Sequence, residues 1–197
     1  MSRNLVNVYG PSGSGKTSLI KELLKVDRLG SLFHKLIGID IAVEITPKYS
    51  LAEMPMPTFK GSVSEYFMLF GIILKENRPP EENILKLLAT IRDFSAQIKQ
   101  HKYEKLLSTS VDKLSAGEKR RLCIARALLE KPSLTIIDEP YANSDESVYG
   151  TINGAILTAK NSLLITHRPV RMDTSLLSKH RSIDIRQLAL VLNTEKW

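Results

Sequence analysis

The chain is poor in cysteine, and this narrows the kinds of protein it can be. Cys123 is the single cysteine among 197 residues. No disulfide within the chain and no multi-cysteine metal cluster can therefore form, and the pattern fits a reducing compartment. We expect Cys123 to be a buried structural thiol.

Long apolar segments are missing as well. The longest apolar run covers residues 67–74, far short of the roughly 20 residues that a membrane-spanning helix needs. The first four residues lead directly into an expected strand, without the apolar region of a secretion signal. These features predict a soluble, cytoplasmic chain. The sequence also has no internal repeat and no long heptad region, which disfavours a coiled-coil chromosome protein.

Basic residues outnumber acidic residues in the chain. The chain has 28 Lys and Arg against 21 Asp and Glu, which gives a formal net charge of +7. Such a chain attracts nucleotides, nucleic acid and acidic lipid headgroups without specifying which. The two most basic stretches, residues 119–121 and 179–181, are short, and we interpret each as a solvated face.

The order of apolar patterns predicts a single α/β domain. Strands are expected at residues 5–8, 35–45, 134–137 and 162–166, and helices at 17–26, 116–130 and 147–158. The proline-rich residues 47–61 are expected to form a loop. Between residues 62 and 114 the apolar residues have helical spacing, for example around Phe94 and Ile98. We therefore predict one domain over residues 1–197, with a core at 1–61 and 115–197, a helical subdomain at about 62–114, and a mainly parallel sheet.

A glycine-rich loop follows the first expected strand. Its sequence GPSGSGKT fits the pattern of a glycine, four residues, and then Gly-Lys-Ser/Thr. Gly13 and Gly15 let the backbone curl around phosphates, Lys16 would reach the β- and γ-phosphates, and Thr17 would ligate Mg²⁺. The loop thus predicts ATP and Mg²⁺ as cofactors. The expected nucleotide contacts are Gly10, Pro11, Ser12, Gly13, Ser14, Gly15, Lys16, Thr17 and Ser18.

Two carboxylates follow the apolar strand at residues 134–137. Asp138 would hold Mg²⁺, largely through water, and Glu139 would polarise or deprotonate the attacking water. His167 follows the next strand and would hydrogen-bond the γ-phosphate and orient Glu139. Alone, the acid pair could cap a helix and the histidine could be structural. Beside the phosphate loop, we assign Glu139, His167 and Lys16 to catalysis.

The start of the helix expected at residues 116–130 offers another place for an anion. Ser115 and Gly117 lie there, where a hydroxyl, exposed N–H groups and the helix dipole converge. By itself this is a good helix cap. Because the chain already has one phosphate loop, a second phosphate-facing terminus favours a nucleotide held by another copy of the chain.

Together these motifs resemble an ABC-type ATPase. The likeness rests on the phosphate loop, on LSAGEKRRLCIARALLEKPSLTIIDEP at residues 114–140 and on Ile165-Thr166-His167, which stand in the family's order. The resemblance implies a P-loop NTPase fold and a head-to-tail dimer that sandwiches two ATP molecules. In such a dimer Ser115 and Gly117 would contact the partner's γ-phosphate, and residues 142–145 would form the loop that crosses the interface.

Two features depart from the family's pattern. The family commonly has a β-subdomain before the phosphate loop, with an aromatic that stacks on adenine, but only nine residues precede Gly10. We therefore expect a reduced N-terminal β-subdomain. Tyr9 is the nearest aromatic, although its strand-end position favours packing. The family's Mg²⁺-sensing glutamine falls near Lys48, whose side chain cannot donate an oxygen to a cation, so either the sensor differs or Lys48 is an ordinary surface residue.

Three functions are compatible with this resemblance. ALLEKPSLTIIDEP and ITHRP resemble transporter ATPases more than DNA-repair ones, which favours an ATP-hydrolysing subunit at the cytoplasmic face of a membrane. Its partners would be a second ABC ATPase subunit, with a homodimer expected, and a separate transmembrane subunit. The first alternative is a soluble ABC ATPase whose closing dimer clamps nucleic acid. The second is a regulatory subunit that pairs with a fuller ATPase.

Overall fold

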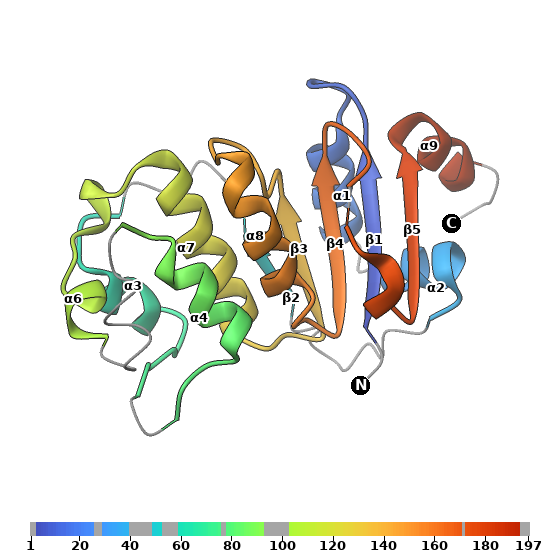
Figure 1. Ribbon diagram of the computed structural model, residues 1–197. Helices are drawn as coiled ribbons and strands as arrows, with labels where there is room; N and C mark the ends of the chain where they lie inside the picture. Colours follow the sequence, from blue (N-terminus) through green and yellow to red (C-terminus); the bar gives the residue numbers. More distant parts are fainter. Residues whose placement is uncertain are drawn as a thin grey trace.

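The protein is an α/β structure in which a parallel sheet lies between two layers of helices (Figure 1). The computed structural model describes residues 3–25, 29–39, 49–52, 59–75, 78–92, 103–170 and 172–193. The strands are β1 (Asn4–Tyr9), β2 (Tyr49–Ala52), β3 (Leu134–Asp138), β4 (Asn161–Thr166) and β5 (Lys179–Asp184). The helices are α1 (Lys16–Lys25), α2 (Leu29–Ile37), α3 (Val63–Met68), α4 (Glu82–Ala89), α6 (Glu104–Leu107), α7 (Ala116–Leu129), α8 (Tyr149–Ile156) and α9 (Ile185–Asn193), with 3₁₀ turns η1 (Val111–Lys113), η2 (Glu146–Val148) and η3 (Thr174–Leu176).

The sheet brings the ends of three strands to one edge. Its order is β2-β3-β4-β1-β5, and each pair of neighbours is parallel. In the register, Tyr9 lies opposite Thr166, and Asp138 lies opposite Ile165. The residues that follow β1, β3 and β4 therefore leave the sheet side by side. This confirms the predicted α/β fold with a parallel sheet.

The sheet separates two apolar cores. Successive residues of a strand point to opposite faces, so Ile137 and Leu164 pack with α4, α7 and α8. Ile136 and Leu163 pack on the other face, with α1, α2 and α9. Both faces are thus covered, which explains why β3 and β4 are continuous buried runs.

The predicted strand at residues 35–45 is wrong over its first three residues. They belong to α2, which buries Leu32, Phe33 and Leu36 along one face. The helix ends at Gly38, whose φ of +62° is the left-handed conformation that commonly terminates helices, and whose N–H donates to the carbonyl of His34. Residues 40–45 lie outside the described part of the chain, as does Lys48.

Three further elements lie where none was predicted. Strand β2 forms within the predicted loop and pairs with β3, and β5 and α9 follow the last strand that the sequence patterns indicated. Strand β5 is exposed over its first four residues, so it lacks the apolar pattern of the inner strands. Its long side chains contact α2, because Lys179 donates to the carbonyl of Gly38 and Arg181 to that of Leu36.

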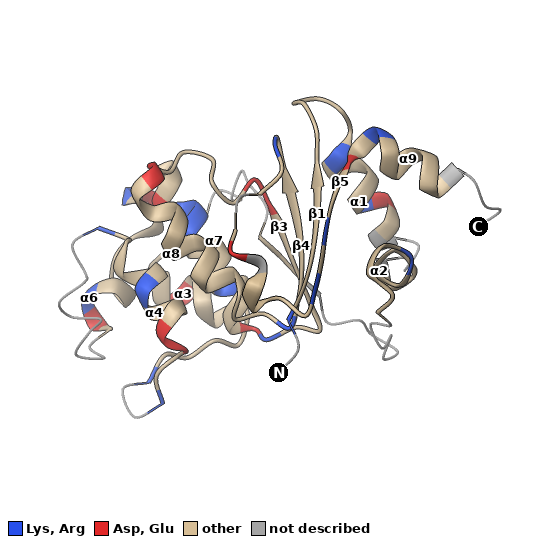
Figure 2. Ribbon diagram, turned by 45° about the vertical axis from the view of Figure 1, so that its right-hand side comes forward, with Lys and Arg blue, Asp and Glu red and all other residues tan. Residues whose placement is uncertain are grey.

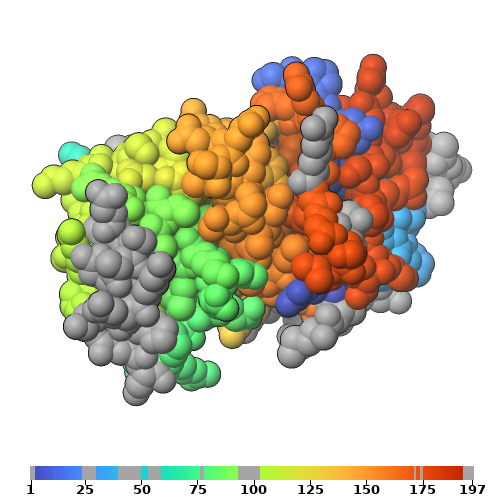
Figure 3. Space-filling view, in the orientation of Figure 1, coloured from blue at the N-terminus to red at the C-terminus, as the bar shows by residue number. Residues whose placement is uncertain are grey.

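Helices dominate the described residues between 62 and 114. Figure 3 shows this segment, in green to lime, at one end of the molecule, with α8 beside it. Helix α3 begins with a capping box in which Ser62 and Glu65 bond each other's backbone N–H groups. The division of the chain into a core and a helical subdomain stays a prediction. Among the described residues, no helix has the length and apolarity needed to cross a membrane.

The basic stretch at residues 119–121 is not a solvated face. Arg120 and Arg121 are only 7% and 9% exposed, since α7 packs against the sheet and against α4. The guanidinium of Arg121 donates to the carbonyl of Thr90. Cys123, on the same helix, is buried beside the hydroxyl of Tyr66, which confirms the structural thiol.

Candidate nucleotide-binding site

The phosphate loop connects the end of β1 to the start of α1. Gly13 and Gly15 have φ of +74° and +82°, so a side chain at either position would be strained. Ser14 N donates to the carbonyl of Pro11, which closes the turn. Pro11 and Ser12 are exposed. The loop therefore presents its crest to solvent, at the edge where the parallel strands end.

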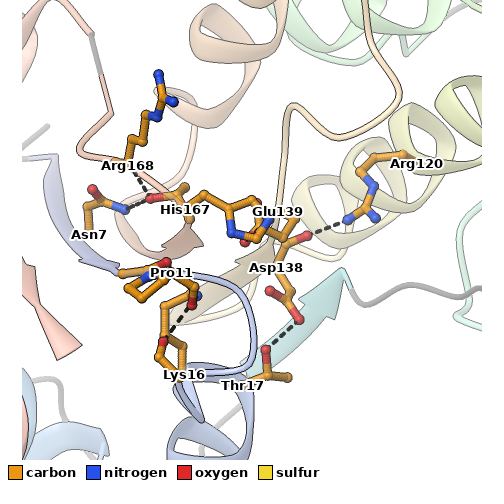
Figure 4. Close-up of polar contacts among 12 residues, drawn as sticks. Asn7, Pro11, Lys16, Thr17, Arg120, Asp138, Glu139, His167 and Arg168 are labelled. Carbon is orange, nitrogen blue, oxygen red and sulfur yellow. Dashed lines mark hydrogen bonds and ion pairs between the residues drawn. The ribbon is translucent and has the colours of Figure 1, made fainter. Parts of the chain in front are cut away.

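Lys16 lies inside this loop. Its side chain is buried, and Nζ donates to the carbonyl oxygens of Gly10 at 2.8 Å and Pro11 at 2.9 Å (Figure 4). These bonds hold the ammonium group at the loop that would surround the phosphates. Gly10 itself is tied to the neighbouring strand, because its N–H donates to the carbonyl of Thr166.

Thr17 and Asp138 meet across the sheet edge. Thr17 Oγ1 donates to Asp138 Oδ2 at 2.9 Å, although the two residues are 121 positions apart. Asp138 Oδ1 is buried and has no hydrogen-bond partner in the structure. Mg²⁺ prefers oxygen ligands from hydroxyl, carboxylate and phosphate groups, so this orphaned oxygen beside a hydroxyl fits the predicted ion.

Glu139 and His167 form the second pair at the edge. His167 Nε2 lies 3.4 Å from Glu139 Oε1 (Figure 4), and the His167 side chain is 55% exposed. Burial raises the pKa of the Glu139 carboxyl, and the charge on Asp138 acts in the same direction. Positive charge on His167, followed by the charges on Lys16 and Arg120, opposes this shift. A carboxylate with a raised pKa is better suited to accept a proton.

Ser115 and Gly117 have local contacts in the single chain. Ser115 forms a capping box with Glu118, with bonds of 3.2 Å and 2.7 Å, which explains why α7 begins at Ala116. Gly117 lies against the backbone of Asn143, in the segment predicted to cross a dimer interface. Contact of Ser115 and Gly117 with a partner's nucleotide, and the role of Ser18, stay predictions.

Replacing Gly117 with alanine is expected to destabilise the fold. An added Cβ would lie 2.1 Å from the carbonyl oxygen of Asn143, and backbone cannot yield easily. We expect Gly117→Ala to lower the free energy of unfolding by about 1–3 kcal/mol, measured by urea denaturation. At Gly154, in α8, the nearest atom is 3.6 Å away, so Gly154→Ala should raise the free energy of unfolding by about 0.5–1 kcal/mol. Equal effects of the two changes would contradict this packing argument.

Two residues near the site carried no signal in the sequence. Asn7 is fully buried in β1 and donates to Thr166 Oγ1 at 2.8 Å, while its Oδ1 accepts from the N–H of Val170. It therefore fixes the segment on both sides of His167. Arg120 reaches the carbonyl of Asp138 from α7 (Figure 4). Tyr9 ends β1 and is partly buried, and nothing in its position assigns it to adenine.

The site consists of a strand, a glycine-rich loop and a helix, beside a parallel strand that ends in two carboxylates. This arrangement defines a P-loop nucleotide-binding protein. The comparisons with known proteins give the family: residues 2–142 match the family described as ABC transporter. The chain belongs to this family.

Its relatives include ATP-binding components of transport systems. The chain is 31% identical to the zinc import ATP-binding protein ZnuC of Marinobacter nauticus, over 81% of this chain and 54% of the relative. It is 30% identical to the lipoprotein-releasing system ATP-binding protein LolD of Chromohalobacter salexigens, over 83% of this chain and 71% of that protein. The chain thus spans about half the length of the zinc-import relative.

Solved structures support the fold. A putative ABC transporter ATP-binding protein from Pyrococcus furiosus matches with a TM-score of 0.56 and 22% identity, over 91% of this chain and 84% of that one. A putative cobalt transport ATP-binding protein matches with a TM-score of 0.58 and 21% identity, over 92% of this chain and 64% of that one.

Proposed function

We propose that the chain binds ATP with Mg²⁺, hydrolyses it, and drives a membrane transporter whose transmembrane part is a separate chain. One observation carries the hydrolysis: the structure brings Lys16, the Thr17–Asp138 pair and the Glu139–His167 pair to one edge of the sheet. These pairs come from distant parts of the chain, and each has a distinct use at a triphosphate. The transport role draws support from the relatives' names, which describe ATP-binding proteins of a zinc import system and of a lipoprotein-releasing system.

The chain's own residues divide the chemistry between them. The N–H groups of the loop and the ammonium of Lys16 bind phosphate oxygens, which positions the γ-phosphate. Glu139 accepts the proton of the attacking water, and His167 orients the Glu139 carboxylate and stabilises charge on the phosphate. Thr17 and Asp138 would hold Mg²⁺, which would supply positive charge to offset that of the phosphate oxygens.

The direct test is release of phosphate from ATP by the purified chain with Mg²⁺. We expect turnover that stops when EDTA removes the divalent ion. If the chain hydrolysed no ATP, either by itself or together with the proposed transmembrane subunit, the catalytic part of the proposal would be refuted.

The dimer belongs to the same proposal. A head-to-tail pair of identical chains would set Ser115 and Gly117 of one copy against the phosphate loop of the other. Two different helices support this arrangement: α7 begins at the exposed Ser115, and α1 begins after the exposed crest of the phosphate loop, so each offers a helix N-terminus to an anion.

An exposed apolar turn supports a protein partner in the membrane. At the end of α3 the side chains of Met68, Leu69, Phe70 and Ile73 are 57%, 68%, 41% and 69% exposed. Grouped exposure of this kind marks an interaction surface. We propose that this apolar turn, residues 68–73, contacts the transmembrane subunit.

Charge changes in the apolar turn are expected to break this contact. Leu69→Asp and Ile73→Asp should each abolish co-purification with the proposed transmembrane subunit. Basal hydrolysis by the isolated chain should stay within about twofold, since surface substitutions rarely disturb the fold. Leu190→Asp is the matched control, because Leu190 on α9 is 66% exposed. Retained co-purification in both turn variants would exclude this surface.

A nucleic-acid clamp is the weaker alternative. Arg120 and Arg121 are buried and bonded to backbone carbonyls, and Lys179 and Arg181 donate to carbonyls at the end of α2. Figure 2 shows the Lys and Arg of the described residues scattered over the helices at both ends of the molecule and along the sheet between them, rather than gathered in one place. Binding of DNA or RNA that stimulates hydrolysis and weakens steeply with salt would favour the alternative.

A further inference from the structure

We propose that Arg120 is a positioning residue for hydrolysis, which holds the peptide group between Asp138 and Glu139 and thereby aims the Glu139 carboxylate. The inference rests on the proposed function, since it concerns how the catalytic base is kept in place. Sequence patterns gave Arg120 no role in the site.

The peptide between Asp138 and Glu139 is held at both of its polar ends. Arg120 Nη1 donates to the carbonyl oxygen of Asp138 at 2.5 Å. The N–H of Glu139 donates to the carbonyl of Ile165 at 2.8 Å. One bond comes from α7 and the other from β4, so two elements on either side of the acid strand fix the plane of a single peptide.

This peptide needs to be held because Glu139 adopts an unfavourable backbone conformation. Its φ is +49°, in the left-handed region that non-glycine residues seldom enter. Such residues persist only where the surroundings fix them, and they gather at functional sites. A rotation of the peptide would relieve the strain and would turn the carboxylate away from His167.

The burial of Arg120 is hard to explain by stability alone. Its side chain is 7% exposed, and Nε has no hydrogen-bond partner in the structure. A buried guanidinium is costly unless it is paired. Arg126 lies six residues further on, is also buried and also has an unpartnered Nε, but it has an acidic partner on its own helix turn: the Glu130 carboxylate lies 2.6 Å from its Nη1. The anionic groups that face Arg120 are Asp138 and Glu139.

The test compares Arg120→Met with Arg120→Lys and with Arg126→Met. Methionine keeps much of the side chain's length and removes the donors, while lysine restores one donor. Arg126→Met is the matched control, since Arg126 is equally buried on α7 but donates to Ser50 and Leu51 of β2 instead.

We expect Arg120→Met to lower kcat about 10–10²-fold, the size of effect that a misplaced catalytic group produces. The Kd for ATP, measured by calorimetry with Mg²⁺, should change less than about threefold, and Arg120→Lys should recover part of kcat. Arg126→Met should lower the melting temperature while kcat stays within about threefold. A kcat for Arg120→Met equal to that of Arg126→Met would overturn the proposal.

A second measurement needs no turnover. Hydrogen exchange at the amide of Glu139 should become faster in Arg120→Met than in the parent chain and in Arg126→Met, because the peptide loses one of its two restraints. Unchanged exchange would overturn the positioning role even if the chain hydrolysed ATP. If the parent chain bound ATP without hydrolysing it, the proposed function would be refuted instead. The exchange rate of the Glu139 amide would still show whether Arg120 restrains the peptide between Asp138 and Glu139.

Discussion

Glu139→Gln is expected to stop ATP turnover while leaving ATP binding intact. The amide keeps the size and most contacts of the carboxylate but cannot take the proton of the attacking water, and loss of a general base typically costs about 10²–10⁴-fold in kcat. Lys16 and Thr17, which would contact the phosphates, are unchanged. Phosphate release and calorimetric titration with ATP measure the two effects separately.

The Glu139→Gln variant also reports on assembly. With hydrolysis blocked, the proposed head-to-tail dimer should accumulate with ATP and appear at twice the monomer mass in light scattering. The fold should not suffer, because burial disfavours the charge that the change removes. Glu82→Gln, a charge removal at an exposed position on α4, should leave turnover unchanged. Undiminished hydrolysis in Glu139→Gln would remove Glu139 as the base.

Lys16→Ala is expected to act one step earlier, on binding itself. Its ammonium is buried within the phosphate loop and is held there by two carbonyl oxygens. Truncating one partner of a buried, hydrogen-bonded charge pair typically costs 2–5 kcal/mol, so the Kd for ATP should rise roughly 10²-fold or more. Titration with ATP in the presence of Mg²⁺ measures this directly.

The control for Lys16→Ala is Lys160→Ala. Lys160 is exposed, just before β4, and at the opposite edge of the sheet from the loop, since parallel strands start at one edge and end at the other. Its loss should leave the Kd for ATP unchanged while removing the same net charge. A similar weakening in both variants would mean that overall charge, rather than Lys16, attracts the nucleotide.

The sequence predicted the parts of the molecule whose signals are local. Strands β1, β3 and β4 and helices α1 and α7 were expected because apolar runs and the glycine-rich loop lie next to one another in the chain. Strand β2 escaped notice because its four residues stand among prolines, and its order depends on pairing with β3. Strand β5 escaped because its exposed residues lack an apolar pattern.

The position of Arg120 could not be predicted from its neighbours in the sequence. Three consecutive basic residues normally lie on a solvated face, and nothing in their spacing distinguishes a guanidinium that points into the protein. Its burial depends on α7 packing across the end of β3, which is a tertiary fact. The same holds for the Thr17–Asp138 bond: each residue was expected to hold Mg²⁺, but only the fold brings their oxygens within 2.9 Å.

The nucleotide-binding site depends on both apolar cores. The phosphate loop is anchored by α1, which packs in the core with α2 and α9, whereas Arg120 reaches the acid strand from α7, which packs in the other core. The loop that carries Lys16 and Thr17 thus depends on one core, and the Asp138–Glu139 peptide that Arg120 holds depends on the other. A nucleotide would therefore bridge the two cores, and it would stabilise the native state by linkage only when both are folded. The stabilisation that a nucleotide provides would then report whether both cores are folded, in addition to the nucleotide's part in catalysis.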